Sequence, residues 1–297
     1  MTKRWFILIM IPLVSTGLLI YLWQTDSAPV ITYFPEDQEI SFAEASTMLE
    51  MVSEKTRDSY EMIWVSKSVS ERELYLRQDA SLLFNNGRLL GIRSKWKENT
   101  DTIQMKEKMD GEDSNFFQAI SIHHGEVHYP DDKIKSIHHM TSDQLYVIDS
   151  PNTTLESFKT PETDYEQEWS QLLDHTTEQQ LLYHWKQLMR HFNIDEESYE
   201  SVPLTNLYKY NTEPLPSFTQ KQTNQIIGQL WEGIYRHYVM NVKNTENSSV
   251  NSYIPLVLFD KQHRHLIVLY EWNGQKERLI QQYPDFSQQK KTTNSPF

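Results

Sequence analysis

The chain has 297 residues and a formal net charge of −13, from 41 acidic and 28 basic side chains. A surface this acidic repels nucleic acid and anionic lipid headgroups, so neither is an expected partner. The sequence contains no cysteine, which excludes disulfides, thiolate nucleophiles and cysteine-ligated zinc.

Residues 5–23 form an apolar run without a charge. As a helix rising about 1.5 Å per residue, this run would span roughly 28 Å, close to the hydrocarbon thickness of a bilayer. Lys3 and Arg4 precede it and Asp26 follows it, so the positive-inside rule leaves residues 1–4 in the cytoplasm. The sequence predicts a single-pass cell-membrane protein whose residues 5–23 contact the lipid bilayer and whose bulk is extracytoplasmic.

A cleaved signal peptide is the alternative to a transmembrane anchor. The only small-residue site near the end of the run, Ser27-Ala28, is followed by Pro29, a poor residue after a scissile bond. Lipid attachment through a lipobox would need a cysteine. The pattern therefore favours an uncleaved signal-anchor, and a cysteine-free exported domain is typical of a bacterial, Gram-positive-like envelope.

The exported part is expected to be α+β, with two units of helix followed by antiparallel meander that could also pack as one. Residues 24–40 indicate a connector, and residues 41–149 the first unit. Ser41 and Glu44 fit a capping box that would begin a helix ending near Lys55. The apolar residues of this helix recur at helical spacing: Phe42, Ala45, Leu49 and Val52.

Short apolar runs separated by turn signals predict the antiparallel meander after that helix. Asn86 and Gly87 can both adopt the positive φ that a two-residue type I′ hairpin turn demands. This turn would place Phe84 opposite Leu89.

A second hairpin turn is predicted at His124 and Gly125, because histidine is enriched at positive φ. The resulting register would bring His123, Glu126 and His128 to one face of the hairpin. Imidazole and carboxylate are ligands that zinc favours, so these three residues are the strongest metal candidate in the sequence. A solvated sheet face explains the same pattern, and the choice stays open.

Residues 150–161 are polar and indicate a linker, and residues 162–284 the second unit, helices followed by a three-stranded meander. Thr160 with Pro161 and then Thr177 with Gln180 predict two successive helices. Ser217 with Gln220 predicts a third helix, with the strongest apolar stripe of the chain: Ile226, Ile227, Leu230, Trp231, Ile234 and Tyr238.

An Asn273-Gly274 turn would close the last hairpin of this unit, setting Glu271 opposite Lys276. Residues 285–297 lack periodicity and predict a disordered tail.

Two other patterns resemble parts of known catalytic or metal sites. His263 and His265 would share one strand face, as in some metalloenzymes, but a carboxylate at a suitable spacing is missing. Ser94 and Lys97 match S-x-x-K, yet the S-D-N and K-T-G partners of that acylation site are absent from the sequence.

No residue is therefore assigned to catalysis, cofactor binding or metal binding, and no cofactor is expected. The sequence favours a non-catalytic interaction or regulatory module of a bacterial envelope, with other envelope or membrane proteins as partners. The alternatives are a carrier for a lipid or peptide, or a membrane-tethered hydrolase that uses carboxylates or a His-bound metal. The specific partner, any small-molecule ligand and the oligomeric state stay open.

Overall fold

The computed structural model describes residues 30–56, 59–150, 154–243 and 251–286. The predicted anchor, residues 5–23, lies outside the described residues, as does the predicted tail after residue 286. No helix among the described residues combines the length and the hydropathy that a membrane span requires. The described residues from Ile31 onward form one compact unit, to which the following description applies.

The first sheet has six antiparallel strands. These are β1 (Phe42–Thr56), β2 (Ser59–Asn85), β3 (Arg88–Gly111), β4 (Asn115–His128), β5 (Ile134–Ile148) and β6 (Glu156–Phe158). β2 is central, because it pairs with β3 along most of its length, with β1 over residues 59–70 and with β4 over residues 76–85.

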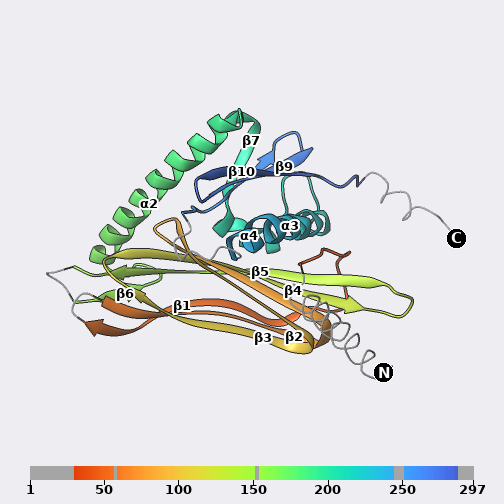
Figure 1. The fold of residues 1–297 in the computed structure, drawn as a ribbon, viewed down its shortest axis with the longest axis horizontal. Helices are drawn as coiled ribbons and strands as arrows, with labels where there is room; N and C mark the ends of the chain where they lie inside the picture. The colour runs from red at the N-terminus through yellow and green to blue at the C-terminus, as the bar shows by residue number, and fades with distance from the viewer. Residues whose placement is uncertain (1–29, 57–58, 151–153, 244–250, 287–297) are drawn as a thin grey trace, which may run out of the picture. The chain divides into compact units, whose positions relative to one another are not determined.

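β2 folds back on itself between its two halves, where its pairing with β3 is also shifted. Side chains of the two halves consequently meet: Trp64 Nε1 donates to Ser81 Oγ at 3.0 Å, and Ser68 Oγ donates to Asp79 Oδ2 at 2.6 Å. The sheet therefore forms two layers face to face, with β1 in one and β4 and β5 in the other (Figure 1).

The space between these layers is apolar at both ends and polar in the middle. Along β4, the inward side chains run from Phe117 and Ala119 through Ser121 and His123 to Val127, and all five are buried. Phe117 and Ala119 belong to one apolar cluster and Val127 to another. The polar middle is thus enclosed by hydrophobic residues on two sides.

The second half of the described chain adds helices and a smaller sheet. In order these are α2 (Asp164–His191), η1 (Glu196–Ser198), β7 (Tyr199–Pro203), η2 (Leu204–Asn211), α3 (Gln220–Ile234), the π-helix η3 (Tyr235–Val239), α4 (Met240–Lys243), β8 (Leu256–Asp260), β9 (His265–Trp272) and β10 (Gln275–Gln282). The four strands pair in the order β10-β9-β8-β7.

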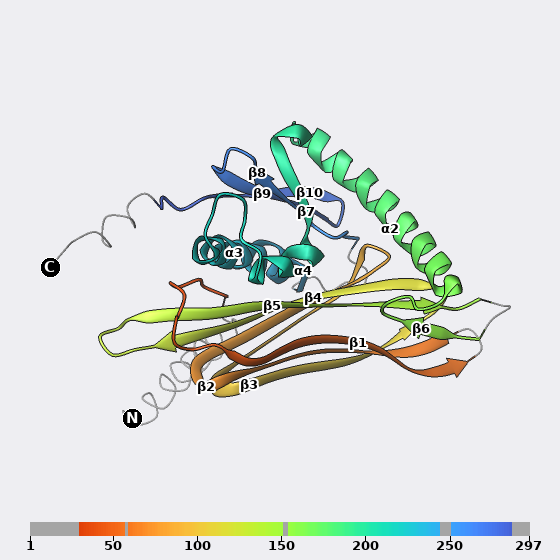
Figure 2. The same ribbon diagram turned by 180° about the vertical axis from the view of Figure 1, so that it is seen from behind.

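α3 lies between the two sheets (Figures 1 and 2). Trp231 Nε1 approaches Met140 Sδ of β5 at 3.0 Å, while Gly233 lies against Leu279 of β10. Every residue of the predicted apolar stripe of α3 and η3 is buried. The arrangement is sheet-rich α+β, mostly antiparallel with a few helices.

Both Asn-Gly turns are confirmed. Phe84 pairs with Leu89 across Asn86-Gly87, and Glu271 pairs with Lys276 across the turn from β9 to β10. Asn86 and Gly87 have φ of 47° and 78°, and Asn273 and Gly274 have φ of 50° and 76°, the positive values that a type I′ turn requires.

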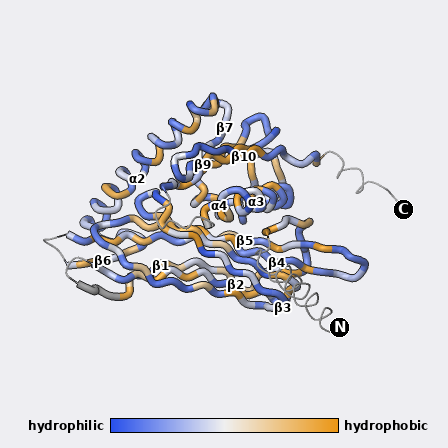
Figure 3. Tube along the Cα trace, viewed as in Figure 1, coloured by the Kyte–Doolittle hydropathy of each residue, from blue (hydrophilic) through white to orange (hydrophobic). Residues whose placement is uncertain are grey.

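The helix predicted from residue 41 to about 55 is wrong, because this segment is β1. Thr47 and Leu49 are buried and Met51 packs on the apolar cluster, whereas Met48 is exposed. That alternation has period two, and Figure 3 shows hydrophilic and hydrophobic residues alternating along these strands. Pairing with β2 outweighed the capping signal at Ser41.

The predicted hairpin at His124-Gly125 is also wrong, because β4 continues straight through both residues. The chain instead turns at Asp131 and Asp132, which have φ of 65° and 55°, before β5 returns along β4. Aspartate tolerates the left-handed region through local hydrogen bonds, and this turn signal outweighed that of His124-Gly125.

The two helices predicted from Thr160 and Thr177 are a single helix, α2. Its capping box is formed by Thr163 and Glu166, and Thr177 is buried in its interior. α3 begins likewise two residues later than expected, with Thr219 as its N-cap.

The division into two domains at residues 150–161 stays a prediction. Within that segment residues 156–158 form β6 and pair with β5.

Candidate functional site

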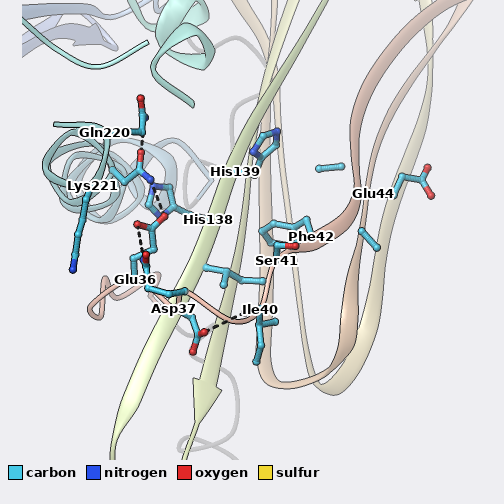
Figure 4. Close-up of a pocket in the computed structure, with 15 residues that line it drawn as sticks. Glu36, Asp37, Ile40, Ser41, Phe42, Glu44, His138, His139, Gln220 and Lys221 are labelled. Atoms are coloured by element: carbon cyan, nitrogen blue, oxygen red, sulfur yellow. Dashed lines mark hydrogen bonds between the residues drawn. The ribbon is translucent and has the colours of Figure 1, made fainter. Parts of the chain in front are cut away.

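A cleft of about 510 Å³ opens beside the first sheet. It is bounded by residues 36–41, the start of β1, residues 137–139 of β5 and the first turn of α3. We call it the connector cleft, because residues 36–40 belong to the predicted connector. In Figure 4, Glu36, Gln220 and His138 lie together, and Phe42 lies apart from them beside Ser41.

The connector is fixed to β5 by hydrogen bonds at Asp37. The Asp37 N–H donates to the Ser136 carbonyl at 2.9 Å, and Asp37 Oδ1 accepts from the N–H groups of Glu39 and Ile40. Burial opposes ionisation of Asp37, but the hydrogen bonds from Tyr129 and the backbone outweigh it and lower the pKa. The carboxylate therefore stays charged and holds the wall of the cleft in one conformation.

A glycine of α3 accommodates the connector on its other side. The Tyr33 ring lies over Gly228, where a Cβ atom would stand 2.2 Å from Tyr33 Cδ2. The Tyr33 N–H donates to Glu232 Oε2 at 3.1 Å, and its ring meets that of His138 edge to face at 6.0 Å. The connector thus packs directly on α3 and β5.

Gly228→Ala is expected to lower the free energy of unfolding by about 1–2 kcal/mol, because overpacking costs more than the gain of about 1 kcal/mol in helix propensity. Gly91→Ala is the matched control, since its Cβ would meet Trp64 only at 3.4 Å. Urea denaturation and limited proteolysis of the connector measure both effects. Equal stability of the two variants would contradict this packing.

The polar side chains that line the connector cleft include Glu36, His138 and Gln220. Glu36 Oε1 accepts from Asn224 Nδ2 at 2.8 Å, and burial raises the pKa of Glu36 despite that hydrogen bond. Gln220 Oε1 and His138 Nδ1 are buried and have no hydrogen-bond partner among the described residues. A ligand that presents N–H donors would satisfy the Glu36 carboxylate and Gln220 Oε1.

A carboxylate, an imidazole and a hydroxyl lie in line between the two layers of the first sheet. Asp79 Oδ2 is 2.7 Å from His123 Nδ1, and His123 Nε2 is 2.8 Å from Thr141 Oγ1. We call these residues the buried triad, since their order is that of a hydrolase triad. Asp79 and His123 are both 0 % exposed.

The hydroxyl of the buried triad is already engaged in a chain of hydrogen bonds. Thr141 Oγ1 lies 2.6 Å from Thr47 Oγ1, which donates to Ser121 Oγ at 2.6 Å, and Ser121 Oγ donates to Ser81 Oγ at 2.7 Å. Catalysis would need a hydroxyl that a substrate carbonyl can approach, whereas this one is shared with its neighbours. The chain of hydrogen bonds gives each of these hydroxyls and both nitrogens of His123 a partner.

Phe42 separates the buried triad from the connector cleft. Its ring contacts that of His123 edge to face at 6.1 Å, and the Arg77 guanidinium lies 4.8 Å from the ring centroid. Arg77 is fully buried and donates to Ser70 Oγ and the Asp101 carbonyl at 2.8 and 2.6 Å. Phe42 therefore covers two ionisable groups.

The structure separates the three residues of the candidate metal cluster. His123 faces the space between the layers, whereas Glu126 lies one strand position out of phase and contacts His128 at 3.3 Å. Among the described residues, no group of three or more His, Asp or Glu is placed to hold a metal ion. The incorrectly predicted hairpin had assigned residues from opposite faces of β4 to one face.

The structure also shows where the other two sequence patterns lie, His263 with His265 and Ser94 with Lys97. His263 has φ 57° and lies in the turn before β9, so it does not share a strand face with His265. Ser94 lies within β3, where its hydroxyl is 2.9 Å from that of Tyr235. Neither pattern brings reactive groups together.

Four histidines form two neighbouring rows across β4 and β5. His123 lies opposite His139, and His124 lies opposite His138. Burial, with repulsion from His138, lowers the pKa of His124 to about 3. Burial, with repulsion from His139, lowers that of His138 to about 4. Nothing in the sequence pairs these positions until the β4–β5 register is known.

This pair makes stability depend on pH. An unfolded histidine titrates near 6.5, so below that pH the unfolded chain binds protons that the folded one does not, and the free energy of unfolding falls. The loss begins near pH 6.5, continues toward the folded pKa values, and reaches about 2 kcal/mol per histidine at pH 5.

Urea denaturation at pH 7.5 and pH 5 measures this loss. His138→Asn should lose about 2 kcal/mol less than the original protein between the two pH values. His175→Asn, on an exposed position of α2, is the control and should leave the pH dependence unchanged. The same pH dependence in both variants would contradict the assignment.

Comparison with known proteins shows no family. No protein-family pattern and no curated protein matches the chain. Among solved structures, a glycosyl hydrolase family 2 member from Bacteroides cellulosilyticus is 11% identical with a TM-score of 0.24, and the match covers 40% of this chain and 17% of that one.

Two further solved structures are similar over a comparable part of the chain. An Arabidopsis thaliana protein is 12% identical with a TM-score of 0.24, covering 43% of this chain and 95% of that one. An Archaeoglobus fulgidus protein is 8% identical with a TM-score of 0.20, covering 41% and 100%. At these scores the likenesses carry no argument about fold or activity.

Proposed function

We propose that this chain is a membrane-anchored extracytoplasmic interaction module of a bacterial, Gram-positive-like envelope, which binds a partner protein in the connector cleft without chemical turnover. The observation that carries the proposal is the Glu36 carboxylate in the cleft, close to Gln220 Oε1, which accepts no hydrogen bond from the described residues. These groups suit a partner segment that presents N–H donors, such as a basic side chain.

The position of the cleft along the chain supports the same proposal. Glu36 follows the end of the predicted anchor, Trp23, after only a short segment. At no more than about 3.6 Å per residue, that segment keeps the cleft within roughly 50 Å of the predicted anchor. A partner in the same membrane would thus meet the cleft at high effective concentration.

A carrier for a peptide is the second candidate, favoured by the cleft volume of about 510 Å³. Cavities of this size accommodate small ligands. Native mass spectrometry of the purified full chain distinguishes it, because a carrier would retain a ligand and an interaction module would not.

Site-specific photocrosslinking in intact membranes tests the interaction. We expect p-benzoylphenylalanine in place of Lys221, at the cleft rim, to capture one discrete protein. The same probe in place of Lys186, exposed on α2, should not capture it. Equal capture from both positions would contradict binding in the cleft.

Glu36→Gln tests the recognition chemistry in the same membranes. A charged hydrogen bond contributes about 1.5–3 kcal/mol, so capture from the cleft should weaken roughly tenfold or more. Glu50→Gln, on an exposed position of β1, is the control. If Glu36→Gln captures as well as the original protein, the partner is not recognised by this carboxylate.

A further inference from the structure

A second cavity, of about 270 Å³, lies at the end of the smaller sheet and shares no residue with the connector cleft. Its lining includes the rings of Phe218, Phe259, Tyr283 and His263. We call it the aromatic pocket. None of the residues on which the proposed function rests lines this pocket.

The rings of the aromatic pocket stand at right angles to one another. Phe218 meets His263 at 5.5 Å with an interplanar angle of 86°, and meets Tyr283 at 5.3 Å with an angle of 84°. Perpendicular rings form walls instead of a flat stack, and their faces carry partial negative charge.

The loop that carries Phe218 is held in place. The Phe218 N–H donates to the Leu215 carbonyl at 3.0 Å, and the Leu215 N–H donates to Thr223 Oγ1 of α3 at 2.9 Å. Ser217 between them has φ 67°, an uncommon conformation for a residue with a side chain, which persists only where its surroundings fix it. The wall is therefore preformed.

Glu200 supplies a carboxylate to the pocket. It lies opposite Phe259 in the β7–β8 register and is half-buried. Its ion pair with Lys209 has an N–O distance of 4.0 Å, at the limit of such contacts. The carboxylate is therefore weakly compensated.

The other two charged side chains that line the pocket, Asp260 and Lys261, have hydrogen-bond partners outside it. Arg264 donates two hydrogen bonds to Asp260, at 2.8 and 3.3 Å, and these lower the pKa of that carboxyl to about 2. Lys261 Nζ donates to the Glu197 carbonyl at 2.7 Å. Of the two carboxylates that line the pocket, Glu200 and Asp260, Glu200 therefore has the more distant cationic partner.

A buried hydroxyl lies beside this carboxylate. Tyr210 is 4 % exposed, and its Oη finds no hydrogen-bond partner among the described residues. Its ring meets Phe259 edge to face at 5.3 Å, and burial together with the charge of Glu200 raises its pKa. Tyr210 does not line the pocket itself but packs against Phe259, which does.

We infer that the aromatic pocket binds a small organic cation that carries a methylated ammonium group. Ring faces attract such a cation and Glu200 neutralises it. A primary ammonium would need acceptors for three N–H groups, whereas the pocket offers rings and one weakly compensated carboxylate. A methylated ammonium carries the same charge but has methyl groups in place of N–H groups, so it needs fewer hydrogen-bond acceptors.

Titration calorimetry of the full chain in a maltoside detergent tests this inference with choline as the probe. The control ligand is 3,3-dimethyl-1-butanol, which has the same shape without the charge. We expect the neutral compound to bind at least about tenfold more weakly, corresponding to the cation–π and carboxylate contributions.

Two variants locate the binding. Glu200→Gln should weaken choline binding about five- to tenfold and leave the neutral compound unaffected, and Phe218→Leu should weaken choline similarly. Glu277→Gln, exposed on β10 and outside the pocket, should bind as the original protein does. Circular dichroism confirms that each variant is folded.

The inference is overturned if choline does not bind, if choline and the neutral compound bind equally, or if Glu200→Gln and Glu277→Gln behave alike. Nanodiscs with phosphatidylcholine distinguish two sources of the same ligand chemistry. Competition of these nanodiscs with free choline would assign the site to a lipid headgroup. Without competition, the site belongs to a soluble cation.

Discussion

Asp79→Ala should lower the free energy of unfolding by about 3–5 kcal/mol, because it leaves a buried cation without its counter-charge. Asp79 accepts from Ser68 and lies 2.7 Å from His123 Nδ1, and its Oδ1 is 3.9 Å from Arg77. All these side chains are buried. Urea denaturation at pH 7.5 measures the loss.

Glu107→Ala is the matched control, since it removes the carboxylate of an ion pair on the exposed part of β3. The Arg93–Glu107 contact is shorter, at 2.6 Å, yet both side chains are more than a third exposed. Solvent screening limits the contribution of this ion pair to the free energy of unfolding to less than about 1 kcal/mol. A similar loss in both variants would show that the buried triad does not organise the interior.

Trp231→Ala should also lower the free energy of unfolding by about 3–5 kcal/mol, through the cavity that it leaves. Trp231 is 1 % exposed and its indole N–H points at Met140 of β5. Because α3 lies between both sheets, loss of this ring should also loosen the wall of the connector cleft. Denaturation and near-ultraviolet circular dichroism report the two effects.

Trp96→Ala removes the same side chain from β3, where the tryptophan is 41 % exposed. This variant should lower the free energy of unfolding by less than about 1 kcal/mol. If Trp96→Ala destabilises as much as Trp231→Ala, α3 does not contribute the main packing between the sheets.

Local signals predicted the elements whose conformation depends on a few neighbouring residues. Both Asn-Gly turns and the apolar stripe of α3 are of this kind. The helix prediction for the segment from Ser41 was wrong because Ala45 and Leu49 fit both a helical and an extended pattern. Only the long-range pairing with β2 selects the strand, and no local pattern contains that information.

The buried triad depends on such long-range pairing throughout. The buried triad joins β2, β4 and β5, and its neighbouring members are 44 and 18 residues apart along the chain. The fold-back of β2, which creates the space for these residues, follows from contacts such as Trp64 with Ser81. The irregular stretch between its two halves, with three consecutive exposed residues, Glu71, Arg72 and Glu73, is the one local signal that could have located the bend.

Comparing the original protein with Thr141→Val in a single preparation tests the central claim most directly. Both full-length proteins would be incubated with cell-wall-derived substrates and then photocrosslinked from position 221 in membranes. Binding through the connector cleft predicts no turnover by either protein and the same captured partner for both. Turnover by the original protein that disappears in Thr141→Val would contradict the account and make the buried triad catalytic.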